Sequence, residues 1–159
     1  MDVCQATIAR ESLTAALIAE LSPLLAAHWH EVAHYADIPL EPDWERYRIL
    51  SANGNLRVYV ARVEGGQLVG YLAVFVTQNL HYASSKVAAQ DVLFVAESHR
   101  RAHLGSDLLV HAEHCLRAEG VQVFTQHCKA AEGKTIQRFL ERRHGYELVD
   151  LVLAKRLDR

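Results

Sequence analysis

The sequence has few cysteines and no long apolar run, and both absences narrow what this protein can be. Its 159 residues include three cysteines, Cys4, Cys115 and Cys128, which lack the spacing of a metal site. An odd number of thiols suits a reducing cytosol better than a disulfide scaffold. The N-terminus, MDVCQATIARESL, has no apolar signal core, and no apolar run approaches the roughly 20 residues of a membrane span. We therefore expect a cytoplasmic protein with no membrane partner.

Excess charge of either sign is also missing. The chain carries 17 basic and 19 acidic residues, for a net charge of −2. Sequence-independent binding of nucleic acid requires a strong positive excess, so no nucleic-acid partner is expected. With 50% hydrophobic residues and no repeats or linker, residues 1–159 are expected to form a single domain. A homodimer is left open.

Helical spacing dominates the first third of the chain. Residues 4–9 are expected to form a short strand, and a stripe of leucines at helical spacing follows. Pro23 interrupts this stripe, and because proline favours the first position of a helix, a second helix is predicted to begin there. It is expected to end before Pro39, and a short helix is predicted over residues 42–52. The stripe consists of Leu13, Leu17 and Leu21.

Segments with a strand pattern follow, and after them strand patterns and helix patterns alternate along the chain. Strands are predicted over residues 56–60, 68–77 and 88–95, with the first two joined by a tight turn. A helix from Leu104 to Gly120, a strand over 121–127, a helix around 136–140 and a last strand or two over 146–157 complete the order. The strand–helix–strand run from 88 to 127 requires a right-handed parallel crossover. We expect an α/β fold of the α+β type, with a mixed, mostly antiparallel sheet of six to seven strands flanked by helices.

The clearest chemical signal lies in residues 91–110, DVLFVAESHRRAHLGSDLLV. A buried strand ends at Val95, a basic turn follows, and a helix begins near Leu104. Free N–H groups and the dipole at a helix N-terminus attract anions. The arginines bring positive charge, and the small residues let the backbone approach a ligand. The residues of this predicted phosphate or pyrophosphate cradle are Arg100, Arg101, Gly105 and Ser106.

The segment RRAHLG, residues 100–105, resembles the coenzyme motif of the GNAT family of N-acetyltransferases. That motif has Arg or Gln, two residues, Gly, one residue, then Gly or Ala, between a strand and a helix; here His103 replaces the first Gly. The closing HGYELVDLVLAKRL and the order of elements also resemble this family, and residues 28–47 and 79–95 resemble phage-encoded members. The resemblance implies the acyl-CoA N-acyltransferase fold and acetyl-CoA as co-substrate, with no metal. The implied coenzyme-binding residues are Phe94, Val95, Arg100, Arg101, Ala102, His103, Leu104, Gly105 and Ser106.

Residues 30–34, HEVAH, match the H-E-x-x-H pattern of zinc hydrolases. Two histidines on one helix face can hold zinc while the glutamate activates water. Ten histidines in the chain make a chance match easy, and no third ligand follows at the expected spacing. The nearest carboxylates, Glu41 and Glu45, lie beyond Pro39, which breaks the helix. A zinc hydrolase is the weaker alternative. The family resemblance places this helix beside the acceptor cleft, where His28, His30, Glu31 and His34 are expected to line the substrate or to be solvated.

The family resemblance implies acetyl transfer to a primary amine by direct attack. It places an oxyanion donor at the backbone N–H of Phe94 or Val95. It also places Leu140 where the family commonly has a tyrosine that protonates the leaving thiolate. Because leucine cannot donate a proton, the usual acid is missing or is supplied elsewhere.

The amine must lose a proton before it attacks, so a base is needed. His81, with Tyr82 beside it, is the predicted base, and Glu31 and Asp91 are the other candidates. A small-molecule amine, a protein lysine and a protein N-terminus all remain as acceptors. A catalytically weak acetyl-CoA-binding protein of the same fold is the alternative from another functional class.

Overall fold

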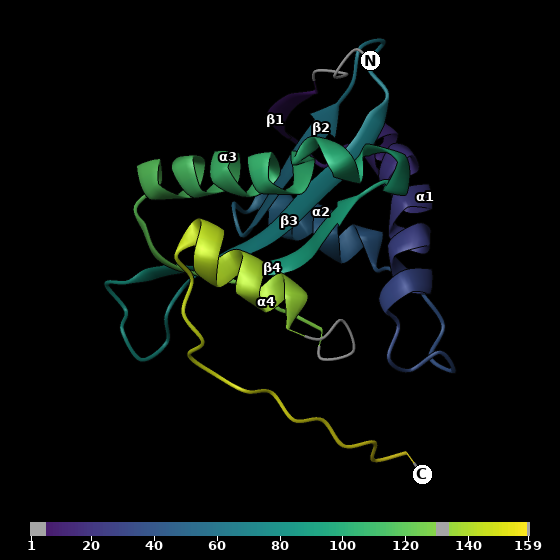
Figure 1. Ribbon diagram of the computed structural model, residues 1–159. Coiled ribbons are helices and arrows are strands. Elements are labelled where there is room, and N and C mark those ends of the chain that lie inside the picture. The colour runs from purple at the N-terminus through teal and green to yellow at the C-terminus, as the bar shows by residue number, and fades with distance from the viewer. Residues whose placement is uncertain (1–5, 130–133, 159) are drawn as a thin grey trace. The chain divides into compact units, whose positions relative to one another are not determined.

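The computed structural model describes residues 6–129 and 134–158, without the side chains of Arg101 and Ala102 (Figure 1). The chain divides into two compact units, Met1–His127 and Cys128–Arg159. Within the described residues, no helix is both long enough and apolar enough to cross a membrane. The first unit holds the whole sheet and the predicted coenzyme loop.

The sheet has five strands in the order β1-β2-β3-β4-β5. Neighbours from β1 to β4 run antiparallel, and β5 pairs parallel to β4. The mixed, mostly antiparallel sheet and the parallel crossover are therefore confirmed. The strands are β1 (Thr7–Glu11), β2 (Leu56–Arg62), β3 (Leu68–Gln78), β4 (Lys86–Val95) and β5 (Val121–Thr125).

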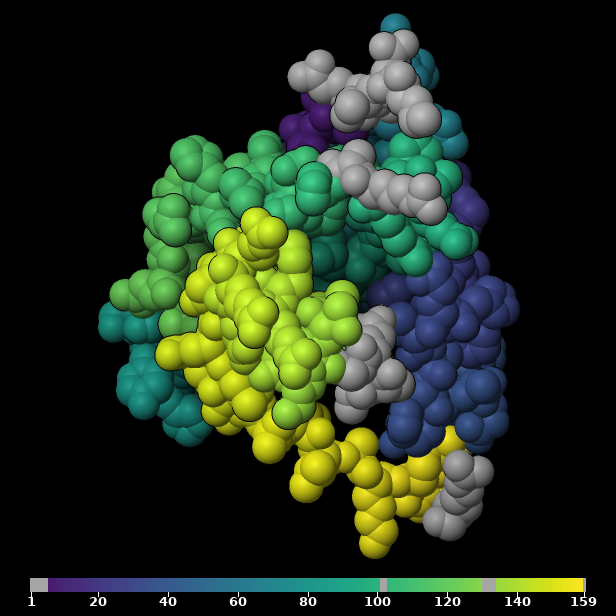
Figure 2. All heavy atoms as spheres, in the orientation of Figure 1, coloured from purple at the N-terminus to yellow at the C-terminus, as the bar shows by residue number. Residues whose placement is uncertain are grey.

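Helices cover both faces of this sheet (Figure 1). Two of them, α1 (Ala15–Val32) and α2 (Trp44–Ala52), pack on one face. The other face carries α3 (Leu104–Ala118), which follows the 3-10 helix η1 (Glu97–Ala102). Figure 2 shows α3, in green, at the surface of this second face. The connection from β4 through η1 to α3 is therefore the crossover that carries the predicted cradle.

Apolar stripes attach the helices to the sheet. Leu17 and Leu21 of α1 are 2% and 3% exposed and pack with Val58 and Tyr71 of the sheet. The stripe predicted on α3 is buried along its whole length. Burial of one such leucine contributes about 1.5–3 kcal/mol. The buried α3 residues are Leu104, Leu108, Leu109, Ala112 and Leu116.

The predicted break at Pro23 is wrong, because α1 continues through it. Proline removes one backbone hydrogen bond from a helix interior. The apolar face nevertheless continues across the proline from Leu21 to Leu24, which packs against the core. Burial of that face offsets the missing bond. The hydroxyl of Ser22 donates to the carbonyl of Ile18 at 2.7 Å, a bond typical of serine within a helix.

A charge cluster joins the end of α3 to the sheet. Glu119, which caps α3, accepts hydrogen bonds from Arg57 Nη2 at 2.7 Å and from Arg57 Nε at 2.9 Å. Arg10 Nη1 donates to the same carboxylate at 3.1 Å, and Lys86 Nζ donates to the Glu119 carbonyl at 2.8 Å. Since Arg57 is 8% exposed, its charge depends on Glu119 for compensation.

The second unit contains two short helical segments, α4 (Thr135–Phe139) and the π-helix η3 (Leu140–His144). Gly145 ends them in the left-handed region, with φ of +72°, a conformation that glycine adopts freely. Residues 145–158 form no strand, which corrects the expected count of six to seven strands to five in the described part of the chain. Alternating apolar residues suit a strand only where burial and hydrogen-bonding partners exist, and here Leu151 and Leu153 are 83% and 96% exposed.

Candidate functional site

A β-bulge interrupts β4 at Asp91. Val92 pairs with Ala73 and Gln90 pairs with Val74, so Asp91 is an extra residue without a partner on β3. Successive side chains of a strand normally point to opposite faces. Here Asp91 and Val92 both line a pocket on the face covered by α1 and α2. The bulge therefore turns a carboxylate into an otherwise apolar interior.

Beyond this bulge, one edge of β4 is open. The parallel pairing with β5 ends at Ala89 and Thr125, whereas the pairing with β3 continues to Val95. The N–H of Ala96 donates to Val69 on β3, and N–H groups alternate in direction along a strand. The N–H of Val95 therefore points away from β3, toward the edge that β5 leaves, and that of Phe94 points toward β3. Of the two predicted donors, Val95 has the backbone direction that a ligand at this edge could use.

The turn between η1 and α3 has a left-handed residue at His103, with φ of 58° and ψ of 12°. Glycine adopts this conformation freely, whereas other residues adopt it at a cost. The histidine thus stands, where the resembled motif has glycine, in a conformation that glycine adopts freely. Its side chain makes no capping hydrogen bond to α3. The imidazole of His103 therefore does not cap the N-terminus of α3.

The first turn of α3 has room for a ligand at the backbone. A Cβ built at Gly105 would meet Val95 Cγ2 at 3.8 Å, an ordinary contact, so the fold itself does not demand glycine here. Leu104 is buried in the core and can offer only its backbone. Ser106 follows in the same turn. The structure does not describe the side chains of Arg101 and Ala102, so their predicted part in the cradle lies outside the described atoms.

Arg100 bridges three elements at the end of β4. Its Nε donates to the carbonyl of Val95 at 2.9 Å, and its Nη2 lies 2.7 and 2.8 Å from the two carboxylate oxygens of Glu31 on α1. The guanidinium also lies over the ring of Phe94, 5.4 Å from its centroid. Two predicted site residues, Arg100 and Glu31, are thereby brought into direct contact. Each is about two-fifths exposed, so solvent and ligands can reach both.

Helix α1 ends within the HEVAH segment, residues 30–34. The helix ends at Val32, and the extended conformation of Ala33 follows, so His30 and His34 do not share a helical turn. Instead, His30 contacts Trp29 and His34 contacts Tyr35, at ring separations of 5.1 and 4.6 Å. The described part of the chain contains no group of three or more potential metal ligands among histidine, cysteine, aspartate and glutamate.

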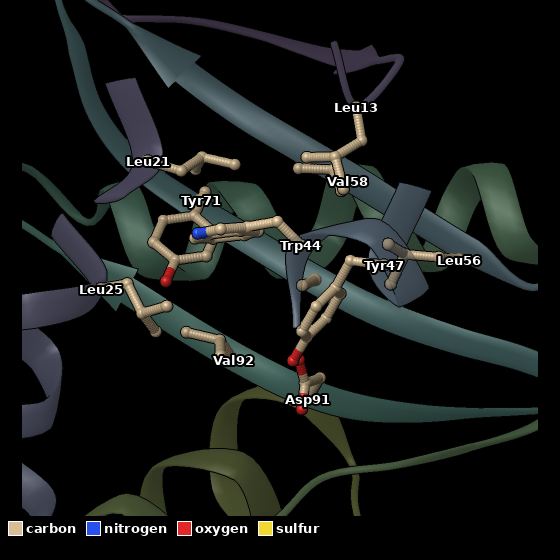
Figure 3. Close-up of a pocket in the computed structure, with 11 residues that line it drawn as sticks. Leu13, Leu21, Leu25, Trp44, Tyr47, Leu56, Val58, Tyr71, Asp91 and Val92 are labelled. Atoms are coloured by element: carbon tan, nitrogen blue, oxygen red, sulfur yellow. The ribbon is translucent and has the colours of Figure 1, made fainter. Parts of the chain in front are cut away.

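A pocket lies between the bulge of β4 and the two helices α1 and α2 (Figure 3). Tyr47 of α2 donates a 2.6 Å hydrogen bond to Asp91 Oδ2. The hydroxyl of Tyr71 on β3 also lies at this pocket and finds no hydrogen-bond partner among the described residues. Burial raises the pKa of both tyrosines well above the ordinary value, and the nearby Asp91 charge adds to the shift. Both phenols are therefore neutral donors at physiological pH.

Tyr47 is the residue that sequence reasoning missed. It comes from a short helix 44 residues before Asp91, and no motif spacing links the two. Its ring packs near Trp44 and Phe75, with centroid distances of 5.7 and 6.1 Å. Only its place in a segment predicted to be helical could have drawn attention to it from the sequence.

The structure does not bring His81 and Tyr82 to the predicted coenzyme loop. They lie in the turn between β3 and β4, where their N–H groups donate to Asn79 Oδ1 at 2.9 and 3.2 Å. This turn precedes Lys86, the first residue of β4, whereas the loop follows Val95 at the other end. Ten residues of strand span about 30 Å. Leu140, the residue at the expected acid position, begins η3 of the second unit.

The sequence model of the acetyltransferase (GNAT) family matches residues 24–146. The chain belongs to this family and is an N-acetyltransferase by that membership. The match includes β4, the left-handed turn and α3. The finer resemblance to phage-encoded members stays a prediction.

Solved structures of the same fold support the architecture. An aminoglycoside acetyltransferase from an uncultured soil metagenomic sample, in complex with sisomicin, has a TM-score of 0.76 at 18% identity, covering 96% of this chain and 97% of that one. A ribosomal-protein-alanine N-acetyltransferase from Brucella melitensis biovar Abortus has a TM-score of 0.70 at 16% identity, covering 95% and 99%. An aminoglycoside 6'-N-acetyltransferase from Acinetobacter baumannii has a TM-score of 0.69 at 15% identity, covering 98% and 99%. A search of curated proteins finds no significant match.

Proposed function

We propose that this protein transfers an acetyl group from acetyl-CoA to a primary amine by direct attack, as a single N-acetyltransferase domain over residues 1–159. The observation that carries this proposal is the continuous path from the open edge of β4 through the left-handed turn at His103 to the N-terminus of α3. The same path matches the family motif at residues 100–105. The odd number of cysteines favours a cytoplasmic location.

The residues present fit the coenzyme. N–H groups at the start of α3, around Leu104, Gly105 and Ser106, are suited to the pyrophosphate, since they carry the positive end of the helix dipole. Arg100 lies beside them and can add charge, as can Arg101 from the same loop. Bound acetyl-CoA would supply an activated acetyl thioester.

Val95 is the proposed oxyanion donor. Its backbone N–H points toward the open edge and can donate a hydrogen bond to the acetyl carbonyl oxygen. Phe94 is better placed to shape the site, because its ring contacts both His28, at 5.4 Å, and the guanidinium of Arg100. The end of α1 thus forms a wall beside this edge.

The proton of the attacking ammonium needs an acceptor near that edge. Glu31 is a proposed base because it lies next to the coenzyme loop through Arg100. His81 and Tyr82 remain proposed from the sequence, although they lie at the far end of β4. Leu140 supplies no acid. The thiol of coenzyme A resembles that of cysteine, whose pKa is ~8.5, so coenzyme A can leave partly as the thiolate.

Two measurements test this function. Acetyl-CoA at a hundred times its dissociation constant should stabilise the fold by about 2.7 kcal/mol, seen as a rise in melting temperature. S-acetylpantetheine, which lacks the pyrophosphate, should give a much smaller rise. With a panel of amines, release of free thiol should depend on the amine. A melting shift without thiol release for any amine would favour the alternative, an acetyl-CoA-binding protein with weak turnover.

A further inference from the structure

We propose that Cys115 of α3 is a site of reversible oxidation by hydroperoxides, with His111 as the base that takes the thiol proton and Tyr59 as the donor that holds the added oxygen. The three residues come from α3 and from β2, a strand that it packs against. Cys115 lies near the opposite end of α3 from Leu104, roughly 16 Å along the helix. The site is therefore separate from the loop proposed to bind coenzyme and does not depend on acetyl transfer.

The thiol of Cys115 is paired with an imidazole one helical turn earlier. Its Sγ lies 3.6 Å from Nε2 of His111, a hydrogen-bond distance for sulfur. Residues four apart share a helix face, so the helix itself holds the two groups together. Where His111 carries its ring proton on Nδ1, its Nε2 accepts the S–H hydrogen, which is the arrangement that activates a cysteine nucleophile. Cys115 is partly exposed, as access by a small hydroperoxide requires.

Tyr59 brings a phenol to this pair from the sheet. Val58 and Val60 belong to the core cluster beneath α1, so Tyr59, between them on β2, points to the face that carries α3. Its ring meets the ring of His111 edge to face, with the centroids 5.8 Å apart. A phenol, an imidazole and a thiol from two elements thus form one cluster beneath α3.

The hydroxyl of Tyr59 is an independent sign that this cluster accepts an oxygen atom. Tyr59 is 0% exposed, and its hydroxyl has no hydrogen-bond partner among the described residues. Burial raises the pKa of Tyr59 to about 12; the charges of Cys115 and Glu119 add to the shift, and those of Arg10 and Arg57 oppose it. The phenol is therefore a neutral donor near the thiol. A buried donor without an acceptor is unfavourable, and an oxygen bound to the sulfur would supply that acceptor.

The oxidation needs only the hydroperoxide as oxidant. The S–H proton moves to Nε2 of His111, and the sulfur of Cys115 attacks one peroxide oxygen. An S–O bond forms as the O–O bond breaks, and the leaving oxygen takes the proton from His111 to become water or an alcohol. Sulfur loses two electrons and the peroxide gains two, which gives a sulfenic acid whose oxygen accepts the hydrogen bond of Tyr59. Two molecules of a small thiol restore the Cys115 thiol and release water and their own disulfide.

The test compares Cys115 with Cys128, the more exposed of the two thiols. The full chain is treated with hydrogen peroxide, sulfenic acid is trapped with dimedone, and peptide mass spectrometry follows each cysteine. We expect Cys115 to be labelled about tenfold faster than Cys128, although exposure alone predicts the reverse order. His111→Gln should slow the labelling of Cys115 by about tenfold or more. His114→Gln, at an exposed position next to Cys115, is the matched control and should leave the rate unchanged.

Tyr59→Phe tests the donor separately. Because the hydroxyl has no partner, the reduced variant should be at least as stable to urea as the parent protein. Its sulfenic acid at Cys115 should have a lifetime about threefold to tenfold shorter, measured by delaying the addition of dimedone. Slower labelling of Cys115 than of Cys128, or an unchanged rate in His111→Gln, overturns the inference. An unchanged lifetime or a lower reduced-state stability in Tyr59→Phe overturns it as well.

Discussion

Arg100 of η1 holds Glu31 of α1 through one nitrogen, with Nη2 2.7 and 2.8 Å from the two carboxylate oxygens. The pair joins the loop proposed to bind coenzyme to the helix proposed to border the acceptor. Both side chains are exposed to about the same degree, 42% and 43%, so the pair adds little to stability. Its importance is that Glu31 holds the Arg100 guanidinium away from coenzyme, while Arg100 holds the Glu31 carboxylate that is proposed as a base.

Removing the carboxylate of this pair should free the arginine for coenzyme. We expect Glu31→Gln to tighten coenzyme A binding by about twofold to fivefold and to change the free energy of unfolding by less than about 1 kcal/mol. Arg100→Ala should weaken coenzyme binding by about tenfold, because a charge-assisted hydrogen bond is lost. Isothermal titration of both variants measures these changes.

Arg48→Ala is the matched control, since Arg48 forms an exposed pair with Glu45 on α2. Its coenzyme affinity should equal that of the parent protein. If Glu31→Gln instead leaves affinity unchanged and abolishes turnover, Glu31 acts as the base rather than as a restraint on Arg100.

Gly105 separates the requirements of folding from those of coenzyme binding. Its φ is not positive and a methyl group there meets only Val95 at 3.8 Å, so Gly105→Ala should stabilise the protein by up to about 1 kcal/mol. The same methyl group would obstruct the approach of a phosphate to the backbone and should weaken coenzyme binding by about tenfold. Gly120→Ala is the opposite case: its φ of +80° predicts lower stability with unchanged coenzyme affinity. Equal coenzyme affinity in both variants would move the cradle elsewhere.

His103→Gly should make the protein more stable by about 1 kcal/mol, since the left-handed conformation costs about 1–2 kcal/mol for a residue with a Cβ. Urea denaturation measures the change. His99→Gly is the control from the same loop; its φ is not positive, and it should lose about 0.5–1 kcal/mol. A loss of stability in His103→Gly would show that the histidine side chain makes a stabilising contact.

Acid should destabilise the protein through Glu119. The hydrogen bond from Arg57 lowers the pKa of Glu119 below its usual value of 4.5, and the charges of Arg57, Arg10 and Lys86 act in the same direction. The stabilisation is present above the unfolded-state pKa, near 4.5, and is lost as the pH falls through the lower folded-state value.

Glu119→Gln should therefore lower stability at pH 7 by about 1–3 kcal/mol and flatten the acid limb of the stability profile. Chemical denaturation between pH 3 and 7 is the measurement. Glu45→Gln, at an exposed pair, should shift stability by less than about 0.5 kcal/mol across this range. An unchanged acid limb in Glu119→Gln would assign the pH dependence to other carboxylates.

The choice of base is tested by comparing Asp91, within β4, with His81, in the turn that precedes β4. A base must lie within hydrogen-bond reach of the proton, directly or through one water. We therefore expect Asp91→Asn to lower kcat/KM for a primary amine more than His81→Ala does. Steady-state thiol release over pH 6 to 9 measures both. A loss of roughly 100-fold in His81→Ala, recovered at high pH and absent from Asp91→Asn, would establish His81 as the base, as the sequence predicts.

Much of the fold was predictable because its elements are set by local periodicity. The leucine stripe of α3 has a helical period, and β3 is a continuous apolar run, so both were predicted close to their observed bounds. Pro23 misled the prediction, because a local rule about helix starts competes with the burial of Leu21 and Leu24. At residues 146–157 the sequence predicted a strand that the structure does not form, because an alternating pattern alone is not sufficient for a strand.

The sequence by itself determined the loop that is proposed to bind coenzyme: a strand, a basic turn and a helix start are contiguous in the chain, so their N–H groups and charges must lie together. It did not determine the pocket beneath α1 and α2. Asp91 enters that pocket only because a bulge adds one residue between two strands, and Tyr47 meets it only because α2 packs on that face 44 residues away in the chain. Register and packing between distant segments depend on how the whole core is filled, and tertiary structure alone decides them.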